Sequence, residues 1–343
     1  GKQGDNIEQS NRLWILIGAT FGALLGSRIL GLLEAGPQLF TVQKPLEVWL
    51  LALFSSKTIV GGLLGGLLGV EGIKKIIGEK NSYMKVMAKI EKPEALTELD
   101  EIIDAADGIM IARGDLAVEV PQEKMPLIQK DIIKRCILKA KPVIVATQMM
   151  DSMIESPNPT RAEITDVANA VLDGADAVML SGETSTGKHP VRVIQIMEKI
   201  LLNVESNGMI YDKDLKPNKG SQTFISDAIC YNAARLSSEL GAKAIVGMTF
   251  SGYTGFMLSS YRPKANIYIF TENRELLNSL SLCWGVEAFY YDKFVGTDST
   301  IKDVIRILKE KGLIEKHELI VNIGSMPLAS KGRANMVKVT EVE

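Results

Sequence analysis

The chain has 343 residues, of which 46% are hydrophobic, and its 39 basic and 41 acidic residues give a formal net charge of -2. A chain of this length can hold two or three domains with buried cores, and its balanced charge provides no excess positive field that would attract nucleic acid or anionic lipid. Three widely spaced cysteines and two histidines argue against a disulfide framework, a zinc site and a histidine-based active site. We therefore expect a protein of the reducing cytoplasm.

The first expected domain, residues 1–78, is rich in glycine and contains two apolar stretches, at 13–33 and 48–70. Each stretch has about the 20 residues that a helix needs to cross a bilayer, although each also carries one charge, Arg28 or Lys57. Glycines recur at four-residue spacing in both stretches, which favours close contact between paired membrane helices. The alternative is a buried helical hairpin of a soluble domain, against which the cost of glycine in a helix argues.

Two segments of this first domain, residues 22–29 (GALLGSRI) and 58–66 (TIVGGLLGG), resemble the prolipoprotein diacylglyceryl transferase family. Val60 stands where that family often carries a catalytic histidine, and the later catalytic segments of the family are missing. Lipid transfer in a membrane is therefore the least favoured function for the chain.

From about residue 79 the sequence changes to short β-branched runs that alternate with charged helical patterns, which is typical of βα units. Four strands are predicted, at 85–90, 108–112, 142–146 and 176–180, and each leads into a helix. Four such units make half of a (β/α)₈ barrel. We therefore expect a partial barrel over residues 79–208.

A second α/β domain is predicted for residues 209–343. A polar linker at 212–221 precedes a helix at 225–240 and a strand at 244–248, and further alternation follows. This pattern is typical of a doubly wound sheet. The predicted fold class is α/β, with the last four βα units of a barrel and a doubly wound domain after a glycine-rich apolar helical segment.

Lys89 and Glu91 lie two residues apart at the end of the first predicted strand. Because side chains alternate along a strand, both should point to the same face, and polar residues at strand ends are the usual reactants of a parallel barrel. An exposed ion pair before a loop is the alternative interpretation.

Two further strand ends carry residues suited to binding an anion with a metal. Asp115 follows the second predicted strand, and Thr147 follows the third. Gly114 would let the backbone approach a ligand and leave amides free for an anion. Glu91 and Asp115 offer the hard oxygen ligands that Mg²⁺ prefers, usually one or two carboxylates beside phosphate oxygens. A lysine, two carboxylates and a threonine at successive strand ends predict a site for phosphoryl transfer.

The fourth predicted strand leads into residues 181–189 (SGETSTGKH), which nearly match the phosphate-binding pattern G-x-x-x-x-G-K-[ST]. The last position fails, because His189 replaces the hydroxyl that would hold magnesium. The favoured interpretation is a strand-to-helix turn in which Glu183 and Lys188 are solvated.

Long motifs run through these four units, at 87–91 (MAKIE), 107–116 (DGIMIARGDL), 146–153 (ATQMMDSM), 159–163 (PTRAE), 166–174 (DVANAVLDG) and 176–184 (DAVMLSGET). Together they resemble the C-terminal half of pyruvate kinases. The resemblance implies that Lys89 neutralises the transferring phosphoryl group and that Glu91 and Asp115 bind Mg²⁺. It also implies that Gly114, Asp115 and Thr147 hold the carboxylate end of phosphoenolpyruvate. ADP is the implied second substrate, K⁺ a second cation, and a homo-oligomer the expected assembly.

The resemblance continues into the last domain, where residues 249–254 (TFSGYT) follow a strand and open a helix. Hydroxyls and free amides at a helix start bind phosphate well. In related enzymes this loop receives a sugar-phosphate effector, which implies Thr249, Ser251, Gly252 and Thr254 as effector-binding residues. A plain helix-capping turn is the alternative.

The first barrel half of the family supplies an arginine for the phosphoryl group, the K⁺ ligands and a lid over the nucleotide, and none of these is found in the sequence. An open half-barrel would expose strand edges and favour self-association. The leading interpretation is therefore phosphoryl transfer from phosphoenolpyruvate to ADP, with an incomplete site and little activity in this chain. The alternative is a non-catalytic effector-binding module, tethered to a membrane through 13–33 and 48–70.

Overall fold

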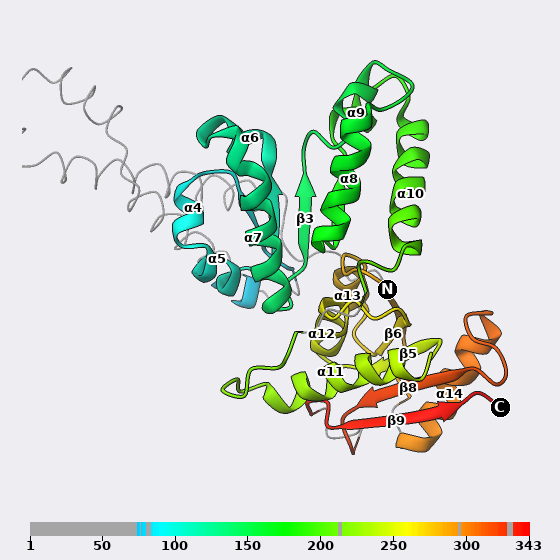
Figure 1. The fold of residues 1–343 in the computed structure, drawn as a ribbon. Helices are drawn as coiled ribbons and strands as arrows, with labels where there is room; N and C mark the ends of the chain where they lie inside the picture. The colour runs from blue at the N-terminus through cyan, green and yellow to red at the C-terminus, as the bar shows by residue number, and fades with distance from the viewer. Residues whose placement is uncertain (1–73, 76, 80–83, 212–214, 294–295, 328–331) are drawn as a thin grey trace, which may run out of the picture. The chain divides into compact units, whose positions relative to one another are not determined.

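The computed structural model describes residues 74–75, 77–79, 84–211, 215–293, 296–327 and 332–343 (Figure 1). These residues form two compact units. One unit holds the described residues up to Gly108 together with Asp115–Pro121, and the other holds Ile109–Gly114 with Gln122–Glu343. The chain therefore crosses between the units three times, and the second crossing, between Gly114 and Asp115, lies inside a predicted site motif.

The first unit contains β1 (Met87–Ile90), α4 (Glu94–Thr97) and α5 (Leu99–Ala105). Leu99 and Ile103 lie four residues apart on α5 and are both buried, so one face of this short helix packs into the unit. The carboxylate of Asp107 accepts a hydrogen bond from the amide of Val86 at 2.9 Å. This bond ties the residue just before β1 to the turn that follows α5.

Three parallel strands follow in chain order, β2 (Gly108–Ala112), β3 (Val143–Ala146) and β4 (Ala177–Met179). All four residues of β3 are buried, as expected for a strand that pairs on both sides. The register aligns Ala112 with Ala146 and Ala146 with Met179. The three strands therefore end side by side, and the loops that follow them leave from one edge.

The helices and turns of this region are α6 (Arg113–Glu119), η2 (Gln122–Lys124), α7 (Met125–Leu138), η3 (Asp151–Ile154), α8 (Arg161–Asp173), α9 (Gly182–Ser185) and α10 (Pro190–Ser206). Helix α8 begins with a capping box, in which Thr160 and Glu163 satisfy each other's free amides. It ends at Gly174, whose φ is 104°. Glycine is favoured there because this left-handed φ strains other residues, and a Cβ would also lie 2.6 Å from Cδ1 of Ile137.

The C-terminal part of the second unit is a five-stranded sheet, and its strands are β5 (Ala244–Met248), β6 (Asn266–Thr271), β7 (Val286–Tyr290), β8 (Leu319–Gly324) and β9 (Met336–Glu341). The order is β7-β6-β5-β8-β9, with β9 antiparallel to β8 and the other pairs parallel. Strands β6, β5, β8 and β9 of this sheet are labelled in Figure 1. The helices are α11 (Phe224–Glu239), α12 (Tyr253–Ser260), α13 (Arg274–Leu280) and α14 (Thr297–Glu310).

Both faces of this sheet are covered by helices. Ile245 belongs to a buried cluster with residues of α11, α12 and α13, whereas its neighbour Val246 belongs to a second cluster with Val304 and Leu308 of α14. Neighbouring residues of a strand point to opposite faces, so the two clusters lie on the two sides of the sheet. The result is the three-layer arrangement of a doubly wound domain.

The strands expected from the sequence are confirmed. The structure places β2 at the predicted 108–112 and β5 at the predicted 244–248, and α11 begins one residue before the predicted 225–240. The apolar stretches 13–33 and 48–70 lie outside the described residues. In the part of the chain that is described, no helix combines the length and the apolar character that a bilayer crossing requires.

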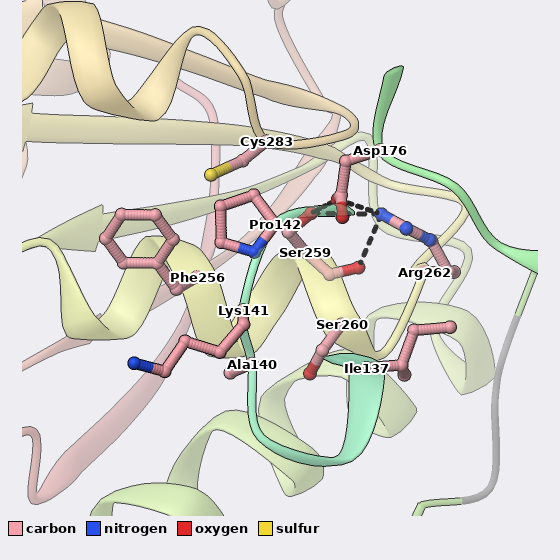
Figure 2. Close-up of a pocket in the computed structure, with 10 residues that line it drawn as sticks. All are labelled: Ile137, Ala140, Lys141, Pro142, Asp176, Phe256, Ser259, Ser260, Arg262 and Cys283. Carbon is pink, nitrogen blue, oxygen red and sulfur yellow. Dashed lines mark hydrogen bonds and ion pairs between the residues drawn. The ribbon is translucent and has the colours of Figure 1, made fainter. Parts of the chain in front are cut away.

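A buried ion pair links β4 to the C-terminal sheet domain, as Figure 2 shows. Nη1 of Arg262 lies 2.9 Å from Oδ1 of Asp176, and the two side chains are only 2% and 7% exposed. The same carboxylate group accepts hydrogen bonds from the amides of Val143 and Trp284, at 2.9 and 3.2 Å. Arg262 also donates to the carbonyl of Gly174. Removing either charge would leave the other buried without a counter-charge.

We expect Arg262→Met to lower the free energy of unfolding by about 3–5 kcal/mol, because it leaves the buried carboxylate of Asp176 unpaired. Urea unfolding followed by circular dichroism measures the loss. Arg306→Met on α14 is the control, since Arg306 is ion-paired with Asp303 and Glu310 in an exposed position, where such pairs contribute little. Equal losses in the two variants would contradict the importance of the buried pair.

Candidate active site

Lys89, Glu91 and Asp115 come together in the first unit. The Nζ atom of Lys89 lies 2.6 Å from Oε2 of Glu91 and 2.7 Å from Oδ2 of Asp115. Lys89 is the third residue of β1 and Glu91 follows the strand directly, while Asp115 lies in the first turn of α6. The expectation that Lys89 and Glu91 point together is confirmed. Asp115, which is 26 residues after Lys89 in the sequence, contacts the same ammonium group.

This cluster is open to solvent, with side-chain exposures of 47% for Lys89, 41% for Glu91 and 56% for Asp115. The hydrogen bond to Asp115, followed by the hydrogen bond to Glu91, raises the pKa of Lys89 above its usual 10.5. The lysine is therefore a firmly protonated cation at neutral pH. Since exposed ion pairs contribute little to stability, the cluster is better suited to binding than to holding the fold together.

Glu91 and Asp115 are also the residues that could hold a divalent cation. Their carboxylates converge on one ammonium group, so their oxygens already surround a single positive charge. Among the described residues, no group of three or more His, Cys, Asp or Glu side chains is arranged to bind a metal. The pair fits Mg²⁺, which typically takes one or two carboxylates and completes its shell with water and phosphate oxygens.

Gly114 and Thr147 come together in the second unit. The amide of Gly114 donates to Oγ1 of Thr147 at 2.8 Å, and the Thr147 hydroxyl donates to the carbonyl of Ala146 at 2.6 Å. A Cβ on Gly114 would lie 3.3 Å from the same Oγ1 atom, which is tighter than ordinary contact. Glycine therefore allows the backbone to come close to the threonine hydroxyl. The approach of a ligand at Gly114, which the sequence predicted, stays a prediction.

Arg113 was not among the residues predicted from the sequence. Its side chain is 13% exposed and pairs with Asp166 of α8 at 2.7 Å, while Nη2 donates to the carbonyl of Thr147 at 2.9 Å. The available signal was an arginine directly before the predicted site glycine, at the end of a buried strand. A motif reading could not show which way its long side chain turns.

Residues 181–189 form a strand-to-helix turn, with the short helix α9 at Gly182–Ser185. The expectation that Glu183 is solvated is wrong, because this residue is only 2% exposed. Its carboxylate accepts hydrogen bonds from the amides of Met150 and Ser181, at 3.2 and 2.7 Å. Those amides lie in the loops that follow the neighbouring strands β3 and β4, and the buried carboxylate accepts from both. Lys188 forms an exposed ion pair with Glu155.

Residues 249–254 follow β5 at the point where the strand order of the C-terminal sheet reverses. The strands that follow β5 in sequence, β6 and β7, lie on one side of it, and β8 lies on the other. In open α/β sheets, ligands bind outside the carboxyl ends of the strands at this position. The turn is therefore in a favourable place for a ligand.

The effector residues predicted in this turn are partly engaged with one another. Oγ1 of Thr249 accepts from the amide of Gly252 at 3.1 Å, and Oγ of Ser251 accepts from the amide of Tyr253 at 3.4 Å. Gly252 has φ 85°, where glycine is favoured, and Thr254 is buried. Ser251 is exposed. A phosphate in this turn would have to replace the internal hydrogen bonds.

Two family models match the chain. The model described as pyruvate kinase, barrel domain, matches residues 68–194, and the model described as pyruvate kinase, alpha/beta domain, matches residues 227–340. The alpha/beta-domain match falls within the predicted doubly wound domain, whereas the barrel-domain match covers most of the predicted partial barrel but begins in the predicted apolar segment, at residue 68. The boundaries proposed from the sequence, 1–78, 79–208 and 209–343, stay predictions.

The chain is similar to several curated pyruvate kinases. That of Lactobacillus delbrueckii subsp. bulgaricus is 42% identical over 272 residues, which cover 78% of this chain and 46% of the relative. That of Geobacillus stearothermophilus is 44% identical over 257 residues, which cover 75% and 44%. The crystal structure of a pyruvate kinase from Cryptosporidium parvum matches with a TM-score of 0.72 at 32% identity, covering 81% of this chain and 57% of that one.

The chain spans about half the length of the curated relatives that it matches. The matches to the family models begin at residue 68. The resemblance of residues 22–66 to the prolipoprotein diacylglyceryl transferase family finds no support in them, and neither does a membrane-associated function.

We expect the pKa of Lys89 to fall toward 10.5 in Asp115→Asn, because that variant removes the largest cause of the upward shift, and to fall less in Glu91→Gln. Since the folded-state pKa is raised, the ion pairs stabilise the protein below the usual lysine pKa and are lost as the pH rises through the folded value. NMR titration of ¹³C-methylated lysine measures the change. Glu119→Gln, an exposed change later in α6, is the control and should leave Lys89 unaltered.

Proposed function

We propose that this chain takes part in phosphoryl transfer from phosphoenolpyruvate to ADP, because models of the two pyruvate kinase domains match residues 68–194 and 227–340. The observation that carries the proposal is the convergence of Glu91 and Asp115 on the ammonium group of Lys89. A protonated lysine can neutralise charge on a transferring phosphoryl group, and positioned charges supply most of the catalysis in this class of reaction.

Glu91 and Asp115 are the proposed ligands of Mg²⁺. A bound Mg²⁺ would neutralise charge on the phosphate oxygens and stabilise the negative charge that develops in the transition state. The two carboxylates already lie against the ammonium group of Lys89, and their exposure leaves room for water and substrate oxygens around a metal. A requirement for K⁺ follows from the family alone, and no residue of this chain is assigned to it.

Gly114, Asp115 and Thr147 are the proposed partners of the substrate carboxylate. The Gly114 amide and the Thr147 hydroxyl are both hydrogen-bond donors, and in the structure they bond to each other or to a neighbouring carbonyl. A carboxylate could accept from both donors in place of these bonds. Gly114 and Asp115 are consecutive residues, which links the carboxylate contacts to the proposed metal ligand through one peptide bond.

We expect Lys89→Met to lower the turnover number by roughly 10²–10³-fold, the loss typical of removing one group that stabilises transition-state charge. ATP formation from phosphoenolpyruvate and ADP, with Mg²⁺ and K⁺ present, is the measurement. Lys92→Met removes an exposed lysine that is three residues further along and outside the cluster, so this variant should keep the parent rate.

Calorimetric titration of phosphoenolpyruvate in the presence of Mg²⁺ provides a second measurement that does not depend on turnover. Lys89→Met should weaken this binding, and Lys92→Met should not. Should the parent chain neither form ATP nor bind phosphoenolpyruvate, the proposed function is wrong. Light scattering on the same material tests the expected homo-oligomer.

A second function, binding of a sugar-phosphate effector by Thr249, Ser251, Gly252 and Thr254, is favoured by the position of this turn at the strand-order reversal. The amides of Gly252 and Tyr253 at the start of α12 are the donors that a phosphate would use. Ser251 is the exposed hydroxyl of the set and the clearest position for a test.

We expect Ser251→Ala to weaken the binding of fructose 1,6-bisphosphate, a sugar phosphate used as the probe, by removing one hydroxyl donor from an exposed position. Isothermal titration calorimetry is the measurement. Ser281→Ala is the matched control, because Ser281 is also exposed and its hydroxyl bonds only to the local carbonyl of Asn278. Equal affinity of the parent chain and Ser251→Ala, or no binding at all, would contradict this role for the turn.

A further inference from the structure

The loop after β3 contains two consecutive residues in the left-handed region of backbone space. Thr147 has φ 69° and Gln148 has φ 54°. Positive φ is uncommon outside glycine, asparagine and aspartate, and for a β-branched residue such as threonine it is a true outlier. Two such residues in succession persist only when surrounding interactions hold them in place.

The guanidinium group of Arg113 supplies these interactions. Nη2 donates to the carbonyl oxygens of both left-handed residues, at 2.9 Å for Thr147 and 3.1 Å for Gln148, and lies 2.9 Å from the sulfur of Met149. One planar group therefore contacts three consecutive residues of the loop. Charge-assisted hydrogen bonds of this kind are among the strongest in proteins.

The guanidinium group is itself held from two helices. Nη1 donates to the carboxylate of Asp166 on α8 at 2.7 Å and reaches Oε1 of Gln129 on α7 at 3.5 Å. Gln129 is buried and donates in turn to Asp173 at 3.2 Å. The Nη1 contacts with Asp166 and Gln129 therefore fix the direction in which Nη2 points toward the loop.

We propose that Arg113 is a positioning residue, which holds Thr147 in its left-handed conformation and thereby aims the Thr147 hydroxyl at the Gly114 amide. The backbone of residue 113 leads directly into Gly114, while its side chain grips the backbone of Thr147. Arg113 therefore fixes both donors that we assign to a carboxylate ligand. The identity of this ligand rests on the proposed function. The Arg113 clamp, meaning the hydrogen bonds from its guanidinium group to the carbonyls of Thr147 and Gln148, does not.

Arg113→Lys tests the clamp, because lysine keeps the charge but lacks the planar fork. In the ligand-free protein, hydrogen exchange of the Gly114 amide should accelerate by roughly tenfold to a hundredfold, the factor expected when a charged hydrogen bond is lost. The amide of Val145, in the middle of β3, should exchange at the parent rate. Phosphoenolpyruvate affinity, measured with Mg²⁺, should fall by a similar factor.

Arg192→Lys is the matched control. Arg192 also donates from its guanidinium group to a backbone carbonyl, that of Pro157 at 2.5 Å, and to the side chain of Asn158. This pair of contacts lies on a different loop, so the substitution should change neither Gly114 exchange nor phosphoenolpyruvate affinity.

A second substitution provides a rescue. Glycine adopts the backbone conformation of residue 148 without strain, so Gln148→Gly added to Arg113→Lys should restore part of the Gly114 protection and part of the affinity. A general loss of stability would not be repaired in this selective way.

The outcomes separate the clamp from the proposed function. Unchanged Gly114 exchange in Arg113→Lys, or equal acceleration at Val145, overturns the clamp. Faster exchange at Gly114 with unaltered phosphoenolpyruvate affinity overturns its role in ligand binding. If the parent chain does not bind phosphoenolpyruvate, the proposed function fails, and the exchange rates still decide whether Arg113 holds the loop.

Discussion

The guanidinium group of Arg113 holds Thr147 and Gln148 in a backbone conformation that neither side chain favours. The candidate site in the second unit depends on this constraint, because the direction of the Thr147 hydroxyl follows from the backbone beneath it. Asp166 and Gln129 hold the other side of the guanidinium group. Side chains of two helices and the end of β2 therefore act together on one turn, and the site is supported by groups that would not touch a ligand.

The cluster of the first unit has the opposite physical character. Lys89, Glu91 and Asp115 are exposed, and their mutual attraction is weakened by water. A ligand that displaced these ion pairs would cost the fold little stability. Opposite charges kept close in an open position are what a site for a metal and a phosphorylated acid needs. The exposure of this cluster therefore argues against a purely structural role and supports the proposed phosphoryl transfer.

Burial decides what the polar groups do in two further places, the ion pair that joins the residue before β4 to the C-terminal sheet domain and the turn after β5. Asp176 and Arg262 are almost fully enclosed, and their charges are balanced by each other and by several backbone groups. In the turn after β5, hydroxyls and amides already bond to one another, so a ligand would exchange these bonds for its own. The position of the turn at the strand-order reversal is the feature that favours a ligand there.

The sequence by itself determined the strands, the α/β class and the residues at the strand ends, because runs such as Val143–Ala146 carry a strong local signal and parallel strands end at one edge. Long motifs also indicated the resemblance to pyruvate kinases, which the matches to two family models support. Only the tertiary structure decided where the long side chains go, including the turn of Arg113 toward Thr147 and the burial of Glu183. These directions depend on partners far away in the sequence, such as Asp166 for Arg113 and Met150 for Glu183, and no local pattern of residues records such contacts.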